Sequence, residues 1–383
     1  MRFRLSMAAL LLCAMGFLSS AGDRSCGQSG ISDCPDSVKV MRFFQLNIWE
    51  GLVNVDNGLD VFCDQLSALM PDVASFCEFP TRGNEAVEER SAEYILGQAI
   101  DYIYEKTGIR YYKTSMTGSG TRGIITRFPI VEGASEVAST KEPGHQLWFY
   151  RTVIDFYGQE VAVYSSHSDY LYFACYLPRG YGDGSEPYSW DKLSDGPVSD
   201  LETVIGRDIA GDRVQLAIDL NNDAKEQAAK GRLCIYAGDL NQPSHLDWTE
   251  ETKNLRGHNG LVVPWSISSF LLSHGFIDAY RAVYPDPLTN PGFTWPVYNK
   301  DAKKITAWAL EADERDRIDF VYFLNNPRIR VLNAQLVGPE LTMDHGKPSR
   351  DNTSADELIQ PWKGVWCSDH RGLLVTFGIN VSR

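Results

Sequence analysis

The sequence predicts an α/β protein whose core is a two-layered sheet covered by helices, folded as one large domain. Strand-like and helix-like segments alternate loosely along the chain, and many strands pair as hairpins, which favours packed sheets with helices outside. Of the 383 residues, 43% are hydrophobic and 11% aromatic, enough for a large core and inconsistent with a disordered or fibrous chain. No internal repeat or linker follows residue 38, so one domain is more economical than the two or three that length alone suggests.

The first residues have the features of a secretory signal peptide. Two arginines precede an apolar run over residues 7–18, and small residues follow at positions 19–21. We therefore expect residues 1–21 to be removed on export, outside the cell or to a periplasm, and residues 22–37 to form a tail. A buried helix is the alternative, and a lipid anchor at Cys13 is disfavoured because no small residues precede it. The run is too short for a membrane span, and no later segment resembles one.

The first half of the remaining chain contains short strands and two helices. The β-rich segment 38–49 comes first, and apolar residues at helical spacing then predict a helix over residues 58–70. A strand follows, and the next helix ends at Gly108. The later expected elements are strand 72–79, helix 85–107 and strands 110–114, 122–128 and 146–156.

The second half begins with a hairpin turn at Tyr157-Gly158, which leads into a strand over residues 160–167. An irregular, aromatic-rich insertion covers about residues 170–198, and a long helical pattern covers about residues 200–230. The remaining expected elements are strand 232–241, a helix over 265–275 closed by Gly275, and strands 317–323 and 371–377.

Seven cysteines remain after the predicted cleavage, and an exported chain can form disulfides. Cys26 and Cys34 lie in a polar stretch and form the most credible pair. Cys77 and Cys234 lie in apolar strands, so we expect them to be core thiols. The odd number leaves at least one free thiol or an intermolecular bond, and no Cys/His spacing suggests zinc.

Polar side chains stand at the ends of six predicted strands or beside them. Carboxylates next to apolar runs are costly unless they are paired or metal-bound, so their recurrence predicts one shared cleft. Their oxygen atoms suit Mg²⁺, Mn²⁺ or Ca²⁺ better than Zn²⁺. These residues are Asn47, Glu78, His167, Asp239, Asn241, Asp319, Asp369 and His370.

In their order along the chain, these motifs resemble the endonuclease/exonuclease/phosphatase superfamily of metal-dependent phosphoesterases. The similarity rests on QLNIW, SFCEF, RGIITRFPI, YSSH, GDLN, RIDFVYF and SDH, which together span about residues 38–379. It implies a four-layered α/β sandwich with two packed mixed β-sheets flanked by helices, over residues 38–383. It also implies an active site at one end of the sandwich.

The resemblance assigns three residues to the metal. Glu78 would be the main ligand of Mg²⁺, or of Mn²⁺ or Ca²⁺, with Asn47 nearby on the metal or the phosphate. Asp369 would complete the first or second shell of ligands.

The other residues would act on the phosphate and the water. His370 would lie against the phosphate, with Asp319 accepting its ring N–H and so fixing its tautomer. Asp239 would polarise or deprotonate the attacking water, and Asn241 would orient the phosphate. His167 would contact a phosphate oxygen or protonate the leaving oxygen.

Each residue also has a simpler structural explanation. Asp239 and Asn241 suit a strand-to-turn cap, Asp319 beside Arg317 suits a buried salt bridge, and His167 suits a core position. Glu78 would then be a loop residue, and the Asp369-His370 pair a surface turn. The ordered set as a whole favours the catalytic interpretation.

Further residues are candidates for substrate binding. Arg122 and Arg371 could neutralise phosphate, although arginines are more commonly exposed or ion-paired. His245 follows the predicted Asn241 closely, yet a structural hydrogen bond to Asp247 explains it equally well. The aromatic insertion at about 170–198 would form a lid that stacks on a base, sugar or head group, or would simply pack over the sandwich edge.

The predicted function is an exported, divalent-metal-dependent phosphodiesterase that uses in-line attack of water. The formal charge of −14 argues against a broad basic surface for nucleic acid and favours a small organic, head-group or nucleotide-type substrate over long DNA. A secreted non-specific deoxyribonuclease is the alternative, which Ser168 after His167 supports slightly, so nucleic acid stays a candidate partner. A non-catalytic scaffold would have lost Glu78, Asp239 or His370, and nothing indicates a protein partner.

Overall fold

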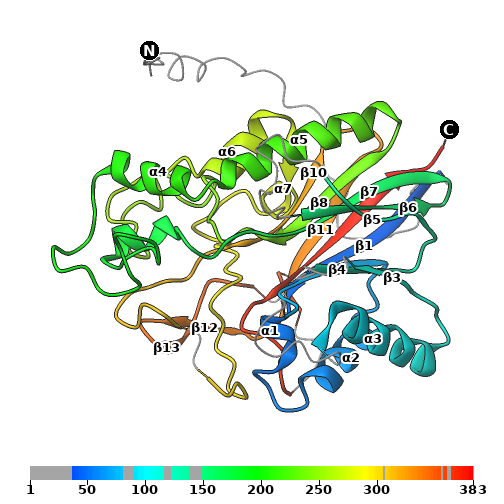
Figure 1. Cartoon of the computed structure of the whole chain (residues 1–383), viewed down its shortest axis with the longest axis horizontal. Helices are drawn as coiled ribbons and strands as arrows, with labels where there is room; N and C mark the ends of the chain where they lie inside the picture. Colours follow the sequence, from blue (N-terminus) through cyan, green and yellow to red (C-terminus); the bar gives the residue numbers. More distant parts are fainter. Residues whose placement is uncertain are drawn as a thin grey trace. The chain divides into compact units, whose positions relative to one another are not determined.

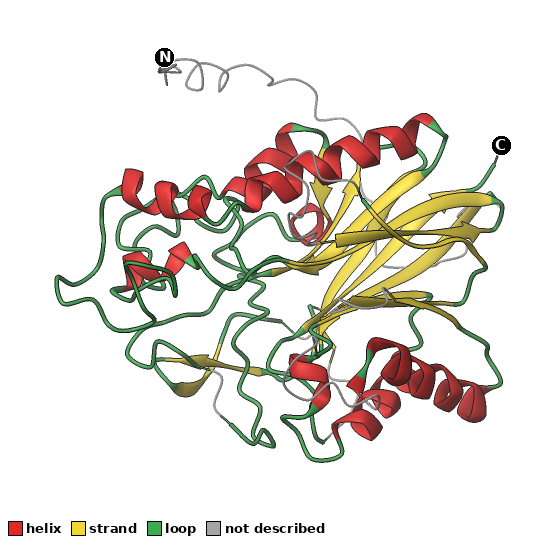
Figure 2. Ribbon diagram, in the orientation of Figure 1, coloured by secondary structure: helices red, strands yellow, loops and turns green. Residues whose placement is uncertain are grey.

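Two large mixed sheets pack face to face, with helices on their outer faces (Figures 1 and 2). The computed structural model describes residues 37–80, 90–115, 122–137, 149–304, 307–354, 357–359 and 364–382. Ser37–Arg383 forms one compact unit. The predicted signal peptide and nearly all of the predicted tail lie outside the described residues. No helix in the described part of the chain is both long and apolar enough to cross a membrane.

The described part of the first sheet has seven strands in the order β14-β11-β15-β1-β2-β4-β3. Strand β1 lies parallel to β2 and antiparallel to β15, which places the first and last strands of the unit side by side. The strands are β1 (Val38–Asn47), β2 (Val73–Cys77), β3 (Tyr112–Ser115), β4 (Arg122–Thr126), β11 (Ile329–Val337), β14 (Leu358–Ile359) and β15 (Gly372–Asn380).

The second sheet has six described strands in the order β5-β6-β7-β8-β10-β9. Strand β7 runs parallel to β8, whereas β10 runs antiparallel to it. The strands are β5 (Ile130–Glu136), β6 (Phe149–Phe156), β7 (Gln159–His167), β8 (Leu233–Asp239), β9 (Phe276–Asp278) and β10 (Asp319–Leu324), and β12 (Leu341–Asp344) and β13 (Lys347–Arg350) form a separate ribbon.

Alternating side chains hold the layers together. In β1, Met41 and Phe43 pack between the sheets, whereas Phe44 and Leu46 pack against the helices outside. This period of two is what a strand buried on both faces requires. Helices α2 (Gly58–Leu69) and α3 (Ala92–Thr107) cover the seven-stranded sheet, and α5 (Arg213–Ala229) and α6 (Ser266–Ser273) cover the other, which completes the four predicted layers (Figure 1).

Helix α3 begins and ends at residues whose local sequence favours these positions. Ser91 caps α3 by accepting a hydrogen bond from the backbone of Tyr94, and Gly108 ends it with a left-handed φ of 72°. The predicted start at residue 85 falls in residues 81–89, which lie outside the described residues. The remaining helical segments are α1 (Trp49–Leu52), the 3₁₀ segment η4 (Ala174–Arg179), α4 (Leu201–Ala210) and α7 (Ala279–Val283).

The single long helix predicted over residues 200–230 is wrong, because two helices occupy it. Asp200 caps α4 through the backbone N–H of Thr203, and the chain turns at Gly211 before α5 begins. Asp212 has a φ of 60°, a left-handed conformation that cannot continue a right-handed helix. Hydrophobic spacing alone did not reveal this two-residue interruption at Gly211 and Asp212.

The cysteines in the described residues are all buried free thiols. Cys77 and Cys234 lie in β2 and β8, which confirms the prediction that they are core thiols. The predicted pair Cys26 and Cys34 lies outside the described residues.

Candidate active site

Strand pairing gathers the predicted site residues at one end of the two sheets. In the parallel pair β1 and β2, Asn47 lies beside Cys77, which immediately precedes Glu78. In the other sheet, Asp239 lies between His167 of parallel β7 and Asp319 of antiparallel β10. The register of the strand pairs therefore brings residues that are far apart in the sequence next to one another.

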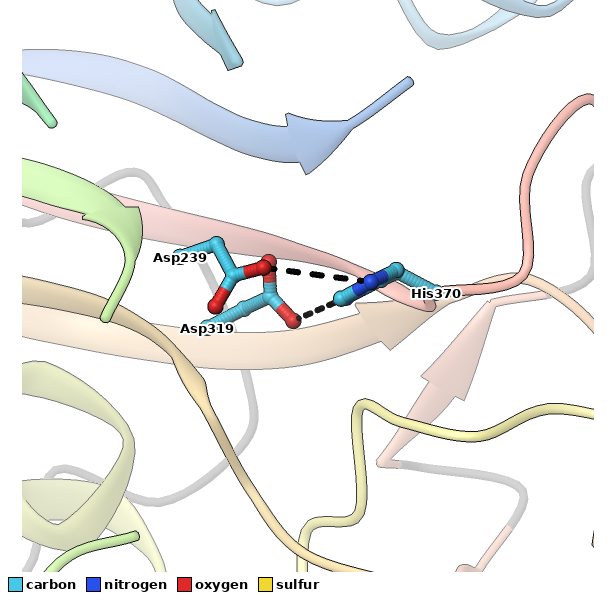
Figure 3. A group of neighbouring side chains, drawn as sticks. All are labelled: Asp239, Asp319 and His370. Carbon is cyan, nitrogen blue, oxygen red and sulfur yellow. Dashed lines mark hydrogen bonds and ion pairs between the residues drawn. The ribbon is translucent and has the colours of Figure 1, made fainter. Parts of the chain in front are cut away.

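A hydrogen bond joins the two sheets at this end (Figure 3). His370, just before β15, contacts Asp319 at the start of β10, with 2.7 Å between Nδ1 and Oδ2. The other ring nitrogen, Nε2, lies 3.8 Å from Asp239 Oδ2. The second oxygen of Asp319 accepts a hydrogen bond of 3.1 Å from Gln45 of β1. All of these side chains are buried, so their charges are weakly screened.

The charges around His370 keep its ring protonated. Burial by itself would lower the pKa of this histidine, but the carboxylates of Asp319 and Asp369 outweigh burial and raise the pKa to about 10. At neutral pH both ring nitrogens therefore carry protons. One proton is held by Asp319, and the other points toward the cavity, where it can be donated to a phosphoryl oxygen.

We predict that Asp319→Asn lowers the pKa of His370 clearly below the wild-type value of about 10. The substitution keeps the shape of the side chain but removes the largest charge that opposes burial, which leaves only Asp369 and Asp239 to stabilise the protonated ring. The pKa is read from the ring resonances of His370 in a pH titration by NMR. The ring of His245, which bonds to Ser268 instead, serves as an internal control and should not change. A His370 pKa that stays near 10 would contradict this account of its charge.

Asp239 is positioned to accept a proton. Its Oδ2 receives a 2.9 Å hydrogen bond from the amide of Asn47, and its Oδ1 receives one of 2.8 Å from the backbone of Asn241. Burial and repulsion from Asp319 raise the pKa of Asp239 to about 7, the range in which a carboxylate is an effective general base at neutral pH.

His167 closes the other side of Asp239, with Nε2 at 3.8 Å from Oδ2. Burial and the positive charges of Arg122 and His370 lower the pKa of His167 to about 3, so the ring is neutral at pH 7. The amide of Asn241 lies 3.4 Å from the same nitrogen. A neutral imidazole can form a hydrogen bond with a phosphate oxygen, which favours the first of the two roles predicted for this residue.

Two further carboxylates, those of Glu78 and Asp369, have no arginine or lysine partner among the described residues. The cation that faces them is the ring of His370, whose Nε2 lies 3.8 Å from Asp369 Oδ1. Asp369 receives a 3.2 Å hydrogen bond from the indole of Trp295 on Oδ2, whereas its buried Oδ1 has no hydrogen-bond partner among the described residues. Burial raises the pKa of Asp369, and burial together with repulsion from Asp369 raises the pKa of Glu78 to about 8. Glu78 also has a left-handed φ of 70°, a costly conformation for a residue other than glycine.

These features fit a divalent cation. The acidic groups Glu78, Asp239, Asp319 and Asp369 meet a single protonated histidine, so the cluster is negative overall. The grouping of Asp239, Asp319 and His370 in Figure 3 also has the composition of a metal site, but its short contact is the histidine–carboxylate hydrogen bond. Glu78, Asp369 and Asn47 are therefore the better candidates for holding the ion, through hard oxygen ligands.

A cavity of about 520 Å³ opens over these groups. The predicted catalytic and metal-binding residues line it, except that Asp319 lies behind His370 and is fully buried. Aromatic residues of the insertion, among them Tyr170 and Trp190, form part of its wall. The insertion therefore has two parts. Tyr170 and Trp190 face the cavity, whereas Cys175 and Leu177 pack in a buried apolar cluster.

Three predicted substrate-binding residues do not line this cavity. Arg371 is fully buried and bound to Asp351 and to backbone carbonyls, so its charge is already neutralised. His245 bonds to Ser268 away from the cavity. Arg122 lies within β4, next to Cys77 of β2, and is buried between the sheets. The structure therefore gives none of the three a contact with substrate in the cavity.

Sequence reasoning missed supporting residues around the site. Gln45 faces the other sheet at the position two before Asn47, where a polar residue in an apolar strand could have signalled it. Ser368 donates a 2.6 Å hydrogen bond to the carbonyl of Asn47 and accepts one from the backbone of His370. Trp295 lies in the FTWP segment, which the sequence indicates as a structural turn, and its indole N–H orients Asp369.

Residues 44–370 match the model of the endonuclease/exonuclease/phosphatase family. The chain belongs to this family. Its members are metal-dependent phosphoesterases and nucleases, so the protein is an enzyme of the metal-dependent phosphoric ester hydrolases. The chain is also 25% identical to the uncharacterized protein F14F9.5 of Caenorhabditis elegans over 303 residues, which cover 78% of this chain and 82% of that protein.

Three solved structures are similar to the chain at low identity. The chain is similar to TDP2 of D. rerio, solved with a single-strand DNA product, at 16% identity, 88% and 98% coverage and a TM-score of 0.47. It is also similar to an endonuclease/exonuclease/phosphatase of Beutenbergia cavernae, at 16% identity, 89% and 72% coverage and a TM-score of 0.48. An AP endonuclease of Archaeoglobus fulgidus is similar at 14% identity, 88% and 98% coverage and a TM-score of 0.44.

Proposed function

We propose that this enzyme hydrolyses a phosphodiester bond of a small substrate by in-line attack of water in the cavity. The observation that supports this most is the buried constellation at the cavity base, where Asp239 faces a protonated His370 beside the unpartnered oxygen of Asp369. It combines a general base, a positive charge and a site for a cation, which phosphodiester hydrolysis requires.

The residues of the chain divide the work by charge and protonation. Asp239 accepts the proton of the attacking water, since its raised pKa makes it basic enough at neutral pH. The second N–H of His370 compensates the charge that grows on a phosphoryl oxygen. The amide of Asn241 and the neutral ring of His167 hold the phosphate in line.

Glu78, Asp369 and Asn47 would hold the divalent cation. When bound, this cation supplies positive charge to the non-bridging and leaving oxygens. Carboxylate and amide oxygens are the ligands that Mg²⁺, Mn²⁺ and Ca²⁺ prefer, so we propose Mg²⁺ as the first ion to test.

Hydrolysis of bis(p-nitrophenyl) phosphate tests the proposal. We expect activity with Mg²⁺, loss of activity with excess chelator and a reduction of about 10²- to 10⁴-fold in kcat for His370→Ala. His274→Ala is the matched control, because His274 is exposed at the end of α6. Activity that survives both the chelator and His370→Ala would reject the assignment.

We further propose that the enzyme is exported, supported by the arginines, apolar run and small residues at positions 1–21. N-terminal analysis of protein recovered from the medium or periplasm should show that this segment is missing. A substrate smaller than long DNA is supported by the charge of −14. A deoxyribonuclease is the alternative, and nicking of plasmid DNA at rates above those for small diesters would favour it.

A further inference from the structure

A continuous series of contacts between aromatic rings leads from His370, at the bottom of the cavity, to the rim. The ring of His370 lies 6.4 Å from that of Trp295, and Trp295 lies 6.3 Å from Phe173. The ring centroids of Phe173 and Tyr176 are then 4.9 Å apart, those of Tyr176 and Trp190 are 5.8 Å apart, and those of Trp190 and Trp308 are 5.6 Å apart. We name as the aromatic wall the cavity-lining residues Trp295, Phe173, Tyr176, Trp190, Tyr170 and Trp308.

The outer part of the aromatic wall faces water. Tyr170 is 58% exposed and Trp308 is 59% exposed, while the rings behind them are half-buried or buried. Large aromatic surfaces left in water beside a cavity have apolar area to bury against a ligand. The exposed rings of Tyr170 and Trp308 are therefore available to bind an apolar part of a ligand.

Hydrogen bonds to Glu314 hold part of the aromatic wall in place. The buried carboxylate of Glu314 accepts hydrogen bonds from the backbone N–H groups of Trp308 and Ala309. The same carboxylate accepts a 2.6 Å hydrogen bond from the hydroxyl of Tyr176. Glu314 therefore ties the insertion to the loop that carries Trp308, which lowers the cost of ordering this loop when a ligand binds.

The described lining of the cavity offers little to bind a strongly charged substituent. Among the described residues that line it, the charged ones outside the predicted site are Glu50 and Lys304, and they form an ion pair of 2.9 Å. In this described lining Lys304 is thus already paired, and the aromatic wall itself carries no charged side chain. A neutral substituent fits this wall best.

The ring orientations favour a flat ligand. Tyr170 lies nearly parallel to Trp190, with an interplanar angle of 14°, and Trp308 is tilted by only 41° from Trp190. The rings beneath cross at steeper angles, 78° between Tyr176 and Trp190 and 71° between Phe173 and Tyr176, so the aligned faces are those of the outer rings. We propose that the aromatic wall binds an uncharged planar ring on one ester substituent, a nucleobase or an aryl group, by stacking on Trp308 and Tyr170. This inference rests on the proposed function, because the ring is carried by the phosphodiester that is cleaved.

Four glycerol phosphodiesters test the proposal. They differ only in the second alcohol, which is ethanol, choline, benzyl alcohol or the 5′-hydroxyl of thymidine, and the phosphomonoester product is measured by mass spectrometry. We expect kcat/KM for the thymidine or the benzyl ester to exceed that for the ethyl and choline esters by at least tenfold. A preference for thymidine over benzyl identifies a nucleobase, and the reverse identifies an aryl group.

Variants connect the preference to the wall. Trp308→Ala and Tyr170→Ala should each lower the ratio of the ring ester to the ethyl ester by about tenfold, and Trp308→Phe should retain most of it. Tyr112→Ala is the matched control, because Tyr112 is 48% exposed on β3 and does not line the cavity. Equal rates for all four esters, or a preference for choline, would overturn the proposal while leaving phosphodiester hydrolysis intact.

A binding measurement makes the outcome independent of turnover. Glu78→Gln is titrated with thymidine 5′-monophosphate and with inorganic phosphate, and binding is followed by isothermal calorimetry in Mg²⁺. We expect the ring to tighten binding at least tenfold, and Trp308→Ala in the same background to remove that gain. Equal affinities of the two phosphates would overturn the inference even if none of the four esters were hydrolysed.

Discussion

Replacing Asp239 with asparagine should reduce kcat by about 10³-fold, in the middle of the range for losing a general base. Asparagine keeps the size of the side chain, and its single carbonyl oxygen can still accept one of the two hydrogen bonds that Asp239 receives from Asn47 and from the backbone of Asn241. It cannot accept a proton, however. Because the pKa of Asp239 is raised to about 7, the wild-type carboxylate is basic enough to take the proton of water at neutral pH.

Steady-state kinetics on bis(p-nitrophenyl) phosphate with saturating Mg²⁺ measure this effect. KM should change much less than kcat, since the lost interaction acts mainly in the transition state. Asp155→Asn is the matched control, because Asp155 lies at the opposite end of the same six-stranded sheet. A loss of less than tenfold in Asp239→Asn would show that another group accepts the proton.

Removing the divalent cation should reduce activity by about 10³-fold or more, because it leaves the acidic cavity base to repel the phosphate. Glu78→Gln should have a similar effect at ordinary Mg²⁺ concentrations. In the wild type, Mg²⁺ at 100 times its Kd should stabilise the protein by about 2.7 kcal/mol and raise Tm by several degrees. In Glu78→Gln the rise in Tm should be largely lost.

Without the cation, the charge of Glu78 should destabilise the folded protein. The pKa of Glu78 is raised to about 8 when folded, above its ordinary value of 4.5, because burial and Asp369 disfavour its charged form. Such a carboxyl group costs stability as pH rises above the unfolded pKa, and the cost is complete above the folded pKa. Metal-free Glu78→Gln should thus exceed the metal-free wild type in stability at pH 9, on the order of 2–4 kcal/mol, and match it near pH 4.

Thermal unfolding at pH 4, 6 and 9, with and without Mg²⁺, measures both effects. Glu105→Gln is a matched control, because Glu105 is exposed on α3 and far from the cavity lining. An equal response of Glu78→Gln and wild type to Mg²⁺ would exclude Glu78 as a main ligand of the ion.

The residues of the candidate site could be predicted from the sequence because the pattern of apolar residues shows where each strand ends. Apolar alternation defines β1, β7 and β8, and Asn47, His167 and Asp239 are the polar residues that close them. A buried polar group must have a partner, so their gathering at one edge followed from the pattern. The break between α4 and α5 was not readable in this way, because the hydrophobic spacing continues across it.

The partners of the arginines, in contrast, could not be predicted from the sequence. In sequence, Arg122 and Arg371 look alike, as cations beside a predicted phosphate site. In the structure, Asp351 and several carbonyls bind Arg371, and β2 and the facing sheet enclose Arg122. A long side chain can reach many partners, and only the packing of distant segments determines which partner it meets.

By itself, the sequence determined the α/β class, the family motifs and the residues that carry the proposed chemistry, because each depends on local patterns of apolar and polar residues. The hydrogen bond between His370 and Asp319 confirms a contact that the family resemblance predicted. Only the tertiary structure decided the oxygen of Asp369 that lacks a hydrogen-bond partner and the aromatic wall. These features join segments from both sheets, the insertion and the loop at Trp308. Contacts of this kind depend on strand register and on the packing of one layer against another, which no single segment encodes.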